Sequence, residues 1–316
     1  METNLPDRRK AYALGETVLD LVSAGGFTMR AVPGGSMLNA SVSLGRMGIE
    51  THLISELGAD ITGDRIIDFL KTCGVNTKYC IRHNHHKTSL ALAFLDNAMK
   101  ASYSFYHDSP ESLEGEEIPV FRAGDILLFG SYYSVKPERR TFLQQVQKAA
   151  IEARCAIYYD LNIRKAQTHD NEIFMHAFLN NMAVASIVKG SDEDFYNLFG
   201  LTDSEKIYEK VKPFCKILII TNGANPLQVF TSTLSKTYSV PKIIPVSTIG
   251  AGDSFNAGFI YGIASSHVNS INFADMLVNE MDRLIGCGLA FATETCLSEE
   301  NYIKANFESD FWKKYI

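Results

Sequence analysis

The chain has 316 residues, of which 46% are hydrophobic and 21% charged, and its formal net charge is −6. The composition is typical of a globular protein, and the length suits one large α/β domain with a well-buried core or two small domains. A mildly acidic chain lacks the basic surface that attracts nucleic acid or anionic lipid, so we expect neither a nucleic-acid partner nor a membrane partner.

The six cysteines are scattered and show no CxxC spacing. This pattern is typical of reduced thiols in a cytosolic protein rather than of a disulfide framework. The first ten residues are polar and charged, and no apolar run reaches the length of a membrane span. We therefore expect a cytoplasmic protein.

Short apolar runs alternate with helical patterns along most of the chain. The predicted strands are Ala11–Leu14, Ile126–Phe129, Ala156–Tyr159, Ala185–Val188 and Ile217–Ile220. Helical patterns lie near residues 36–48, 62–73, 137–153, 192–199 and 252–264. Continuously apolar strands suit a parallel sheet that is covered on both faces, and the alternation predicts βαβ units in an α/β sandwich.

Two segments depart from this alternation. Residues Gly26–Val32 form a short β-like piece, and the apolar runs Ser89–Leu95 and Ala101–Tyr106 flank a predicted hairpin turn at Asp96-Asn97-Ala98. These pieces could form a small separate sheet that acts as a lid over a substrate. They could equally extend one edge of the main sheet, and the local pattern does not decide between the two.

The strongest chemical signal is the run Gly250-Ala251-Gly252-Asp253, which opens a helix with an apolar face. The glycines allow backbone N–H groups to approach a ligand closely, and the start of a helix attracts anions. Such a site can hold the charge on a phosphoryl group during transfer, while Asp253 accepts a proton from the attacking hydroxyl. Taken alone, Asp253 could also be an ordinary carboxylate at a helix start.

The wider pattern resembles the PfkB, or ribokinase-like, family of carbohydrate kinases. Ser247-Thr248-Ile249-Gly250-Ala251-Gly252-Asp253 is similar to the family's C-terminal signature, Asp-Thr-x-Gly-Ala-Gly-Asp. Gly34-Gly35-Ser-Met-Leu-Asn39 and Leu57-Gly58-Ala-Asp60-Ile-Thr-Gly63 match its N-terminal glycine signatures. The resemblance runs from about Ala11 to Thr295 in the right order, so we identify the chain as a member of this family.

The resemblance implies a ribokinase-like three-layer α/β/α sandwich with a small β-sheet lid. It implies a single kinase domain over residues 1–316, with lid segments near residues 15–35 and 87–108. The lid sheets of the family often pair, so a homodimer through the lid is an expected assembly, although a monomer is compatible with the same pattern.

The resemblance also implies the catalytic roles. Asp253 would deprotonate the sugar hydroxyl, and the amides of Gly250, Ala251 and Gly252 would stabilise charge on the γ-phosphoryl group of MgATP. The Walker-type GxxxxGK[ST] loop is absent from the sequence, so ordinary P-loop chemistry is not expected.

The sugar contacts carried over from the family are Asp20, Gly34, Gly35, Asn39 and Arg164. A carboxylate such as Asp20 can accept hydrogen bonds from two vicinal hydroxyls at once, although a loop or cap role is the alternative.

Arg164 ends a run that begins at Asp160, and this run is similar to the Asp-Pro-Asn-x-Arg of fructokinases and 2-keto-3-deoxygluconate kinases. A guanidinium suits substrate or phosphate oxygens, and an ion pair between Arg164 and Asp160 is the alternative.

For the nucleotide, the resemblance implies contacts from Lys189, Ser191, Thr221 and Gly223. Ser191 and Asp194 stand where the family has Asn-x-x-Glu, which organises magnesium through water. Mg²⁺ keeps its waters and prefers oxygen ligands, so Asp194 could serve in that way. Ser191 as a helix N-cap, with acidic residues in the first turn, is the alternative.

Ser247 is a departure from the family pattern. The aspartate that is usual at this position helps to hold a monovalent cation beside the anion site, and serine removes that carboxylate. Activation by potassium is therefore not expected, whereas the proton chemistry of Asp253 is not directly touched.

The predicted function is ATP-dependent phosphorylation of a small free sugar, with fructose or a related ketose as the first choice. A 2-keto-3-deoxygluconate-type sugar-acid kinase is the nearest alternative, followed by a nucleoside kinase and a non-catalytic ligand-binding relative. Sugar-acid kinases often carry an arginine just after the paired aromatics of the hairpin, where this chain has His107, and this difference favours a neutral sugar.

Overall fold

The computed structural model describes residues 9–23, 25, 28–95, 101–108, 110, 112–163, 172–266 and 278–307. The chain divides into two compact units. The first comprises Met1–Ser112, Ile243–His267 and Arg283–Ile316, and the second comprises Leu113–Lys242 and Val268–Asp282. The prediction of one kinase domain over the whole chain stays a prediction.

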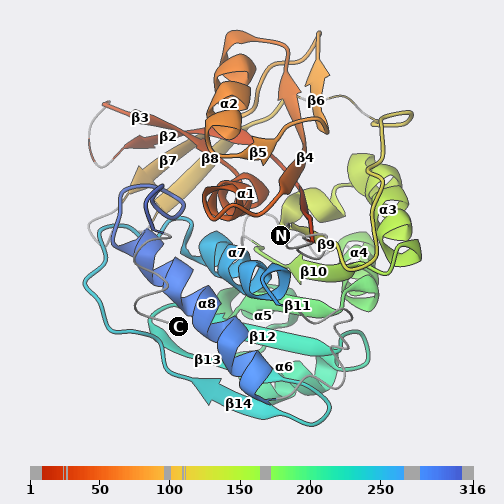
Figure 1. The fold of residues 1–316 in the computed structure, drawn as a ribbon, viewed down its shortest axis with the longest axis vertical. Coiled ribbons are helices and arrows are strands. Elements are labelled where there is room, and N and C mark those ends of the chain that lie inside the picture. Colours follow the sequence, from red (N-terminus) through yellow and green to blue (C-terminus); the bar gives the residue numbers. More distant parts are fainter. Residues whose placement is uncertain are drawn as a thin grey trace, which may run out of the picture. The chain divides into compact units, whose positions relative to one another are not determined.

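The first unit contains a group of parallel strands around β4 (Thr51–Gly58), which pairs with β1 (Ala11–Leu14), β5 (Val75–Asn76) and β6 (Cys80–His83). Helices α1 (Ser36–Arg46) and α7 (Ala251–Ala264) pack against each other (Figure 1). These two helices are distant in the sequence, and their contact joins the two family signatures. The unit also holds α2 (Ile61–Thr72) and most of α8 (Val278–Cys296).

A separate four-stranded sheet also belongs to the first unit. Its order is β3-β2-β7-β8, formed by Arg30–Gly34, Val18–Ser23, Leu90–Leu95 and Ala101–Tyr106. β7 and β8 are antiparallel neighbours, as the hairpin prediction requires. The predicted turn at Asp96–Ala98 lies outside the described residues. The prediction of a small separate sheet is thus confirmed over the alternative of an extended main-sheet edge.

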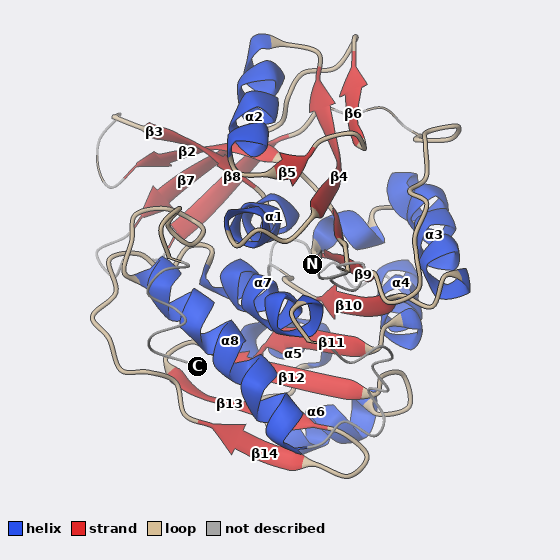
Figure 2. Ribbon diagram, viewed as in Figure 1, coloured by secondary structure: helices blue, strands red, loops and turns tan. Residues whose placement is uncertain are grey.

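The second unit is built on a row of strands that Figure 2 shows in red. Parallel neighbours follow in the order β9 (Ile126–Gly130), β10 (Ala156–Asp160), β11 (Ile187–Ser191) and β12 (Ile217–Asn222). β13 (Asn225–Phe230) and β14 (Ser235–Tyr238) continue the row in antiparallel pairing. The remaining elements are η1 (Tyr132–Val135), α3 (Pro137–Glu152), α4 (Glu172–Val184), α5 (Asp192–Phe199) and α6 (Ser204–Val211).

The parallel strands of this unit are buried along nearly their whole length. All five residues of β9 and of β10 are buried, as expected for a sheet with both faces covered. The register places the carboxyl ends of β10, β11 and β12 side by side, with Asp160 opposite Lys189 and Ser191 opposite Thr221. Ligands of such sheets bind beyond these strand ends, so the polar residues there are candidates for a site.

The predicted α/β fold is confirmed, and all six cysteines carry free thiols. Within the part of the chain that the structure describes, no helix combines the length and the apolar character that a membrane crossing requires.

Candidate active site

Asp253 lies in the first turn of α7 and is half-buried. The Ser36 hydroxyl donates to its Oδ1 at 2.6 Å, and the Asn39 side-chain amide donates to its Oδ2 at 2.8 Å. Both donors belong to the first two turns of α1, so the packing of α1 on α7 fixes the carboxylate. The donors are neutral, and Asp253 is therefore oriented without an ion pair from either of them.

The turn before α7 explains why Gly250 is glycine. Its backbone has a φ of 79°, in the left-handed region, and a Cβ built on it would lie 1.9 Å from the Asn301 carbonyl oxygen. Any other residue would meet both the conformational strain and the clash. Gly252, in the first turn of α7, is exposed. The N–H groups of a first helical turn lack intrahelical acceptors. The predicted anion-site residues Gly250, Ala251 and Gly252 thus form the N-terminal end of a fourteen-residue helix.

A buried group of hydroxyls lies behind Asp253. Thr295 donates from its Oγ1 to the Ser254 hydroxyl at 2.7 Å, and the Ser254 and Ser43 hydroxyls are 3.4 Å apart. Ser43 also donates to the Asn39 carbonyl at 3.0 Å. All three hydroxyl residues are fully buried. This network joins α1, α7 and α8 directly behind the carboxylate and its amide donor, so it restrains the geometry of the pair.

The predicted sugar contacts of the first unit come together near α1. Asp20 lies in β2 and is 6% exposed, and its Oδ2 is 2.0 Å from the position that a Cβ on Gly34 would occupy. Gly35 caps α1 with a φ of 112°, and a Cβ there would lie 2.2 Å from the Glu16 carbonyl oxygen. A side chain at either glycine would displace its neighbour, so this close approach needs glycine.

A contact between a histidine and a carboxylate accompanies these residues. His107 Nδ1 and Glu16 Oε1 are 3.1 Å apart, and the His107 ring stacks on Phe105 with centroids 5.5 Å apart. Sequence reasoning did not assign a role to Glu16, although it stands two residues after the predicted first strand. Ser36 was also missed, although it stands inside the quoted glycine signature. Its position one residue after Gly35 was the available signal.

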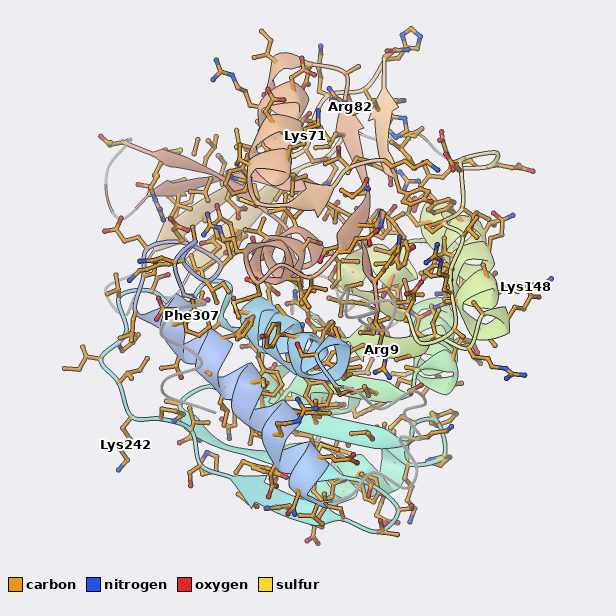
Figure 3. The ribbon with its side chains drawn as sticks, in the orientation of Figure 1. Arg9, Lys71, Arg82, Lys148, Lys242 and Phe307 are labelled. Carbon is orange, nitrogen blue, oxygen red and sulfur yellow. The ribbon has the colours of Figure 1, made fainter. Side chains whose placement is uncertain are left out.

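The Asp60 stretch has a structural explanation. Asp60 caps α2 by accepting from the Gly63 N–H at 2.8 Å, and it also accepts from the Thr88 N–H and hydroxyl at 2.9 and 2.7 Å. Arg82, labelled in Figure 3, donates to the Gly58 carbonyl at 3.1 and 2.9 Å. These bonds fix the segment that leads into β7 and hence one strand of the small sheet.

In the second unit, Asp160 and Lys189 form a buried ion pair. Lys189 Nζ lies 2.9 Å from Asp160 Oδ1, and the side chains are 6% and 1% exposed. Lys189 was predicted as a nucleotide contact, and Arg164 was considered as the partner of Asp160. The structure gives Asp160 the lysine as a partner, while Arg164 lies outside the described residues.

Asp194 is buried at the start of α5, where it forms a capping box with Ser191. Its Oδ2 accepts from the Ser191 N–H at 2.6 Å and hydroxyl at 2.8 Å, and its Oδ1 accepts from the Ile163 N–H at 2.5 Å. Burial raises its pKa to about 6, assisted by the negative charge of Asp160 and opposed by Lys189 and these hydrogen bonds. Oδ1 therefore holds the loop at Ile163, and Oδ2 holds the start of α5 at Ser191.

The Thr221 and Gly223 predictions fall at the end of β12. Thr221 lies opposite Ser191 in the sheet, and its hydroxyl is 3.5 Å from the Gly190 carbonyl. Gly223 is exposed, with a φ of 52°, between the paired residues Asn222 and Asn225. It thus belongs to a two-residue hairpin turn, which requires positive φ whether or not a nucleotide is bound.

Comparison with known proteins decides the family. The model of the pfkB family carbohydrate kinases matches residues 9–298. The chain belongs to this family. Its enzymatic class is therefore that of a phosphotransferase acting on a sugar hydroxyl, as the sequence predicted.

Individual pfkB relatives show how distant the similarity is. The fructokinase of Escherichia coli is 26% identical over 265 residues, covering 83% of this chain and 86% of the relative. Fructokinase-2 of Oryza sativa subsp. japonica is 25% identical over 252 residues, covering 78% and 74%.

Solved structures agree on the fold. The fructokinase from Vibrio cholerae O395 in its fructose, ADP and calcium ion bound form aligns with a TM-score of 0.83 at 19% identity, over 98% of this chain and 99% of that one. The aminoimidazole riboside kinase from Salmonella enterica aligns with a TM-score of 0.82 at 19% identity, over 96% and 99%. The chain therefore has the ribokinase-like α/β fold of the pfkB kinases, with a separate small sheet.

Proposed function

We propose that this carbohydrate kinase transfers the γ-phosphoryl group of ATP to a hydroxyl of a small free sugar, with Asp253 as the general base. The observation that carries the proposal is the half-buried Asp253 carboxylate, held by Ser36 and Asn39 at the start of α7. A catalytic base must be oriented, reachable and able to gain a proton.

The donors of Asp253 suit this task. A cation beside the carboxylate would stabilise the charged form and weaken it as a base, whereas Ser36 and Asn39 are neutral. The sugar hydroxyl can take the place of the Ser36 hydroxyl at Oδ1 and pass its proton there as its oxygen attacks. The amides of Gly250, Ala251 and Gly252 then face the charge of the transferred phosphoryl group.

The sugar is proposed to lie between β2 and the start of α1. Asp20, Gly34, Gly35 and Asn39 are the contacts in the first unit, and Arg164 remains a proposed contact from the sequence. The Asp20 carboxylate lies against Gly34, where it can accept from two vicinal hydroxyls. Asn39 also donates to Asp253, so it would hold the sugar and the base in a fixed position relative to each other.

For the nucleotide, Ser191, Thr221 and Gly223 remain the proposed contacts. Lys189 is buried with Asp160, so its proposed influence on ATP phosphates is through charge rather than through an exposed ammonium. Mg²⁺ is proposed to arrive with the phosphates and to keep most of its waters. Asp194 does not suit direct ligation, because both of its oxygens accept hydrogen bonds from the protein. Only a contact through water is proposed for it.

Two observations favour fructose or a related ketose as substrate. The curated relatives include fructokinases of bacteria and plants at about 25% identity. The position after the hairpin aromatics is His107, paired with Glu16, and so does not present an arginine to a sugar carboxylate. A sugar-acid kinase, a nucleoside kinase and a non-catalytic ligand-binding relative are the alternatives.

A homodimer through the small sheet is also proposed. Phe94 and Tyr106, on its two neighbouring strands β7 and β8, are 44% and 59% exposed. Light scattering of the purified protein gives its mass, and a monomer at all concentrations would contradict this assembly. The cytoplasmic location stays a prediction, supported by the free cysteines.

The test of the proposed function is an ADP-release screen with fructose, tagatose, ribose, 2-keto-3-deoxygluconate and adenosine. We expect the highest kcat/KM with fructose or tagatose. Preference for 2-keto-3-deoxygluconate or adenosine would replace the substrate assignment by one of the alternatives. Sugar binding without any turnover would favour the non-catalytic relative.

A further inference from the structure

The small sheet presents a chemically distinctive face. In its strand register Asp20 lies opposite Val32 in β3 and Ala91 in β7, and Ala91 lies opposite Phe105 in β8. Directly paired residues of neighbouring strands share one face of a sheet. Asp20 and Phe105 therefore lie in one row, two strand spacings or about 10 Å apart.

The same face carries a stack of rings along β8. Tyr103, Phe105 and His107 are two residues apart, so their side chains point to the same side. The Tyr103 and Phe105 ring centroids are 5.7 Å apart with an angle of 8° between planes, and those of Phe105 and His107 are 5.5 Å apart with an angle of 7°. Phe105 is therefore stacked between Tyr103 and His107, and this ring stack runs next to the row of Asp20.

Between Asp20 and the rings, the face is lined by small side chains. β7 reads Leu-Ala-Leu-Ala-Phe-Leu, and Ala91 and Ala93 are the residues that share the face of Asp20. Leu90 and Leu92 point to the opposite side. Ala91 and Ala93 are fully buried and Asp20 is 6% exposed. The carboxylate and the ring stack therefore share the buried face of the sheet, with only the small side chain of Ala91 between Asp20 and Phe105 in their row.

Glu16 adds a second carboxylate at the His107 end of the stack. Its Oε1 lies 3.1 Å from His107 Nδ1, and its side chain is 24% exposed. Its carbonyl oxygen lies against Gly35, one of the proposed sugar contacts. Arg30 shares the face of Asp20 at the end away from His107, and it donates to the Glu299 carbonyl at 2.8 Å.

From this arrangement we infer that the Glu16–His107 pair, together with the aromatic stack of β8, makes the sugar site selective for uncharged sugars against sugar acids. This inference rests on the proposed function and specifies its substrate class. The sugar lies beside the ring stack on the face of Asp20, and its hydroxyls donate to the carboxylates of Asp20 and Glu16.

A substrate carboxylate would be disfavoured at this site. It would face Glu16 and Asp20, and like charges brought together across an interface oppose binding. His107 gives such a substrate little compensation, because its Nδ1 is already engaged by Glu16. Glu16 has two effects: it accepts from a neutral sugar and it repels an anionic one.

The test compares kcat/KM for fructose with kcat/KM for 2-keto-3-deoxygluconate in wild type, Glu16→Gln and His107→Gln. In Glu16→Gln the ratio should fall by at least about fivefold, because the repelling charge is lost while the side-chain shape is kept. In His107→Gln the ratio should be equal or higher, because Glu16 keeps its charge and loses a partner. Local structural damage would instead move the ratio in the same direction in Glu16→Gln and in His107→Gln.

The matched control is Glu56→Gln. Glu56 also pairs with a histidine, His83, at 3.2 Å in the same unit, but on β4 and β6 rather than on the face of Asp20. Its ratio should equal that of wild type. A smaller fall in Glu16→Gln, equal falls in both Glu16 and His107 variants, or a wild type that prefers the acid would overturn the selectivity inference. Turnover of neither sugar by wild type would refute the sugar-kinase assignment itself.

Discussion

Two carboxylate clusters at helix starts illustrate different uses of the same side chain. Asp253, in the first unit, is half-buried and held by a hydroxyl and an amide. Asp194, in the second unit, is buried and accepts hydrogen bonds from two backbone N–H groups and a hydroxyl. The charges of Asp160 and Lys189 also act on its pKa.

The difference between the clusters concerns which bonds a ligand can replace. A hydroxyl donor on an accessible carboxylate can be exchanged for a substrate hydroxyl at little cost. A buried ion pair cannot be opened without leaving a charge unpaired in the interior. We therefore assign chemistry to the first cluster and fold maintenance to the second, and substitutions in each should separate these roles.

The largest effect is expected from Asp253→Asn. Removal of a general base typically lowers kcat by about 10²- to 10⁴-fold, while the amide keeps the shape of the side chain. Steady-state kinetics and thermal unfolding of the same preparation measure the two consequences. Near-normal turnover would show that Asp253 is not the base. A large loss of thermal stability would show that its main role is to maintain the fold.

The second prediction concerns Lys189→Met, which removes the buried ammonium that pairs with Asp160. Breaking a buried pair in this way typically costs about 3–5 kcal/mol in the free energy of unfolding, measurable by urea titration. The matched control is Lys212→Met, which removes an exposed partner of Glu209 and should cost less than about 1 kcal/mol. Equal losses in the two variants would contradict the structural role of the buried pair.

The third prediction follows from the raised pKa of Asp194. Its ordinary value of 3.8 becomes about 6 in the folded protein, so the folded state binds the proton more tightly than the unfolded state. This carboxyl therefore destabilises the fold above about pH 6 by about 3 kcal/mol, and the penalty disappears as the pH falls toward 4.

The Asp194→Asn variant isolates that contribution. The unfolding free energy of wild type minus that of the variant should increase as the pH falls from about 6 to about 4, because the other groups cancel in the difference. A difference that stays constant over this range would show that Asp194 titrates normally.

The smallest effect is expected from exchanging monovalent cations. The Ser247 hydroxyl accepts from the Ile249 N–H at 3.2 Å, a bond within the turn that precedes Gly250. With no carboxylate at this position, replacing potassium by choline at constant ionic strength should change kcat by less than about twofold. A strong potassium requirement would show that the turn recruits the ion through other oxygens.

Much of the parallel core was predictable from the sequence. The runs at Ile126 and Ile217 begin their observed strands, because short, continuously apolar segments between helical patterns are typical of strands in a covered parallel sheet. β2 escaped prediction because it carries a buried Asp20 and Ser23, so its pattern is not that of an apolar strand. α4 was missed because its apolar residues show little helical periodicity. α6 was missed although Asp203 is an N-cap that accepts from the Lys206 N–H at 3.0 Å.

The site was predictable only in part. Asp253 and Asn39 were identified from their signatures, but their hydrogen bond depends on the packing of α1 against α7. Sequence spacing could not show that Lys189 turns to Asp160, because that contact follows from the register of two strands. The Glu16–His107 pair likewise joins residues that are far apart in the chain.

The contact between Gly250 and Asn301 has a consequence for how the protein is made. The turn that opens α7 rests on a carbonyl that is synthesised some fifty residues later, and the Ile303 N–H donates to Ser43 at 3.4 Å behind the same helices. During translation, Asp253 thus leaves the ribosome well before the segment around Asn301 that supports its turn. A nascent chain ending before Asn301 would lack this support, so phosphotransfer should begin only after that segment has emerged and folded.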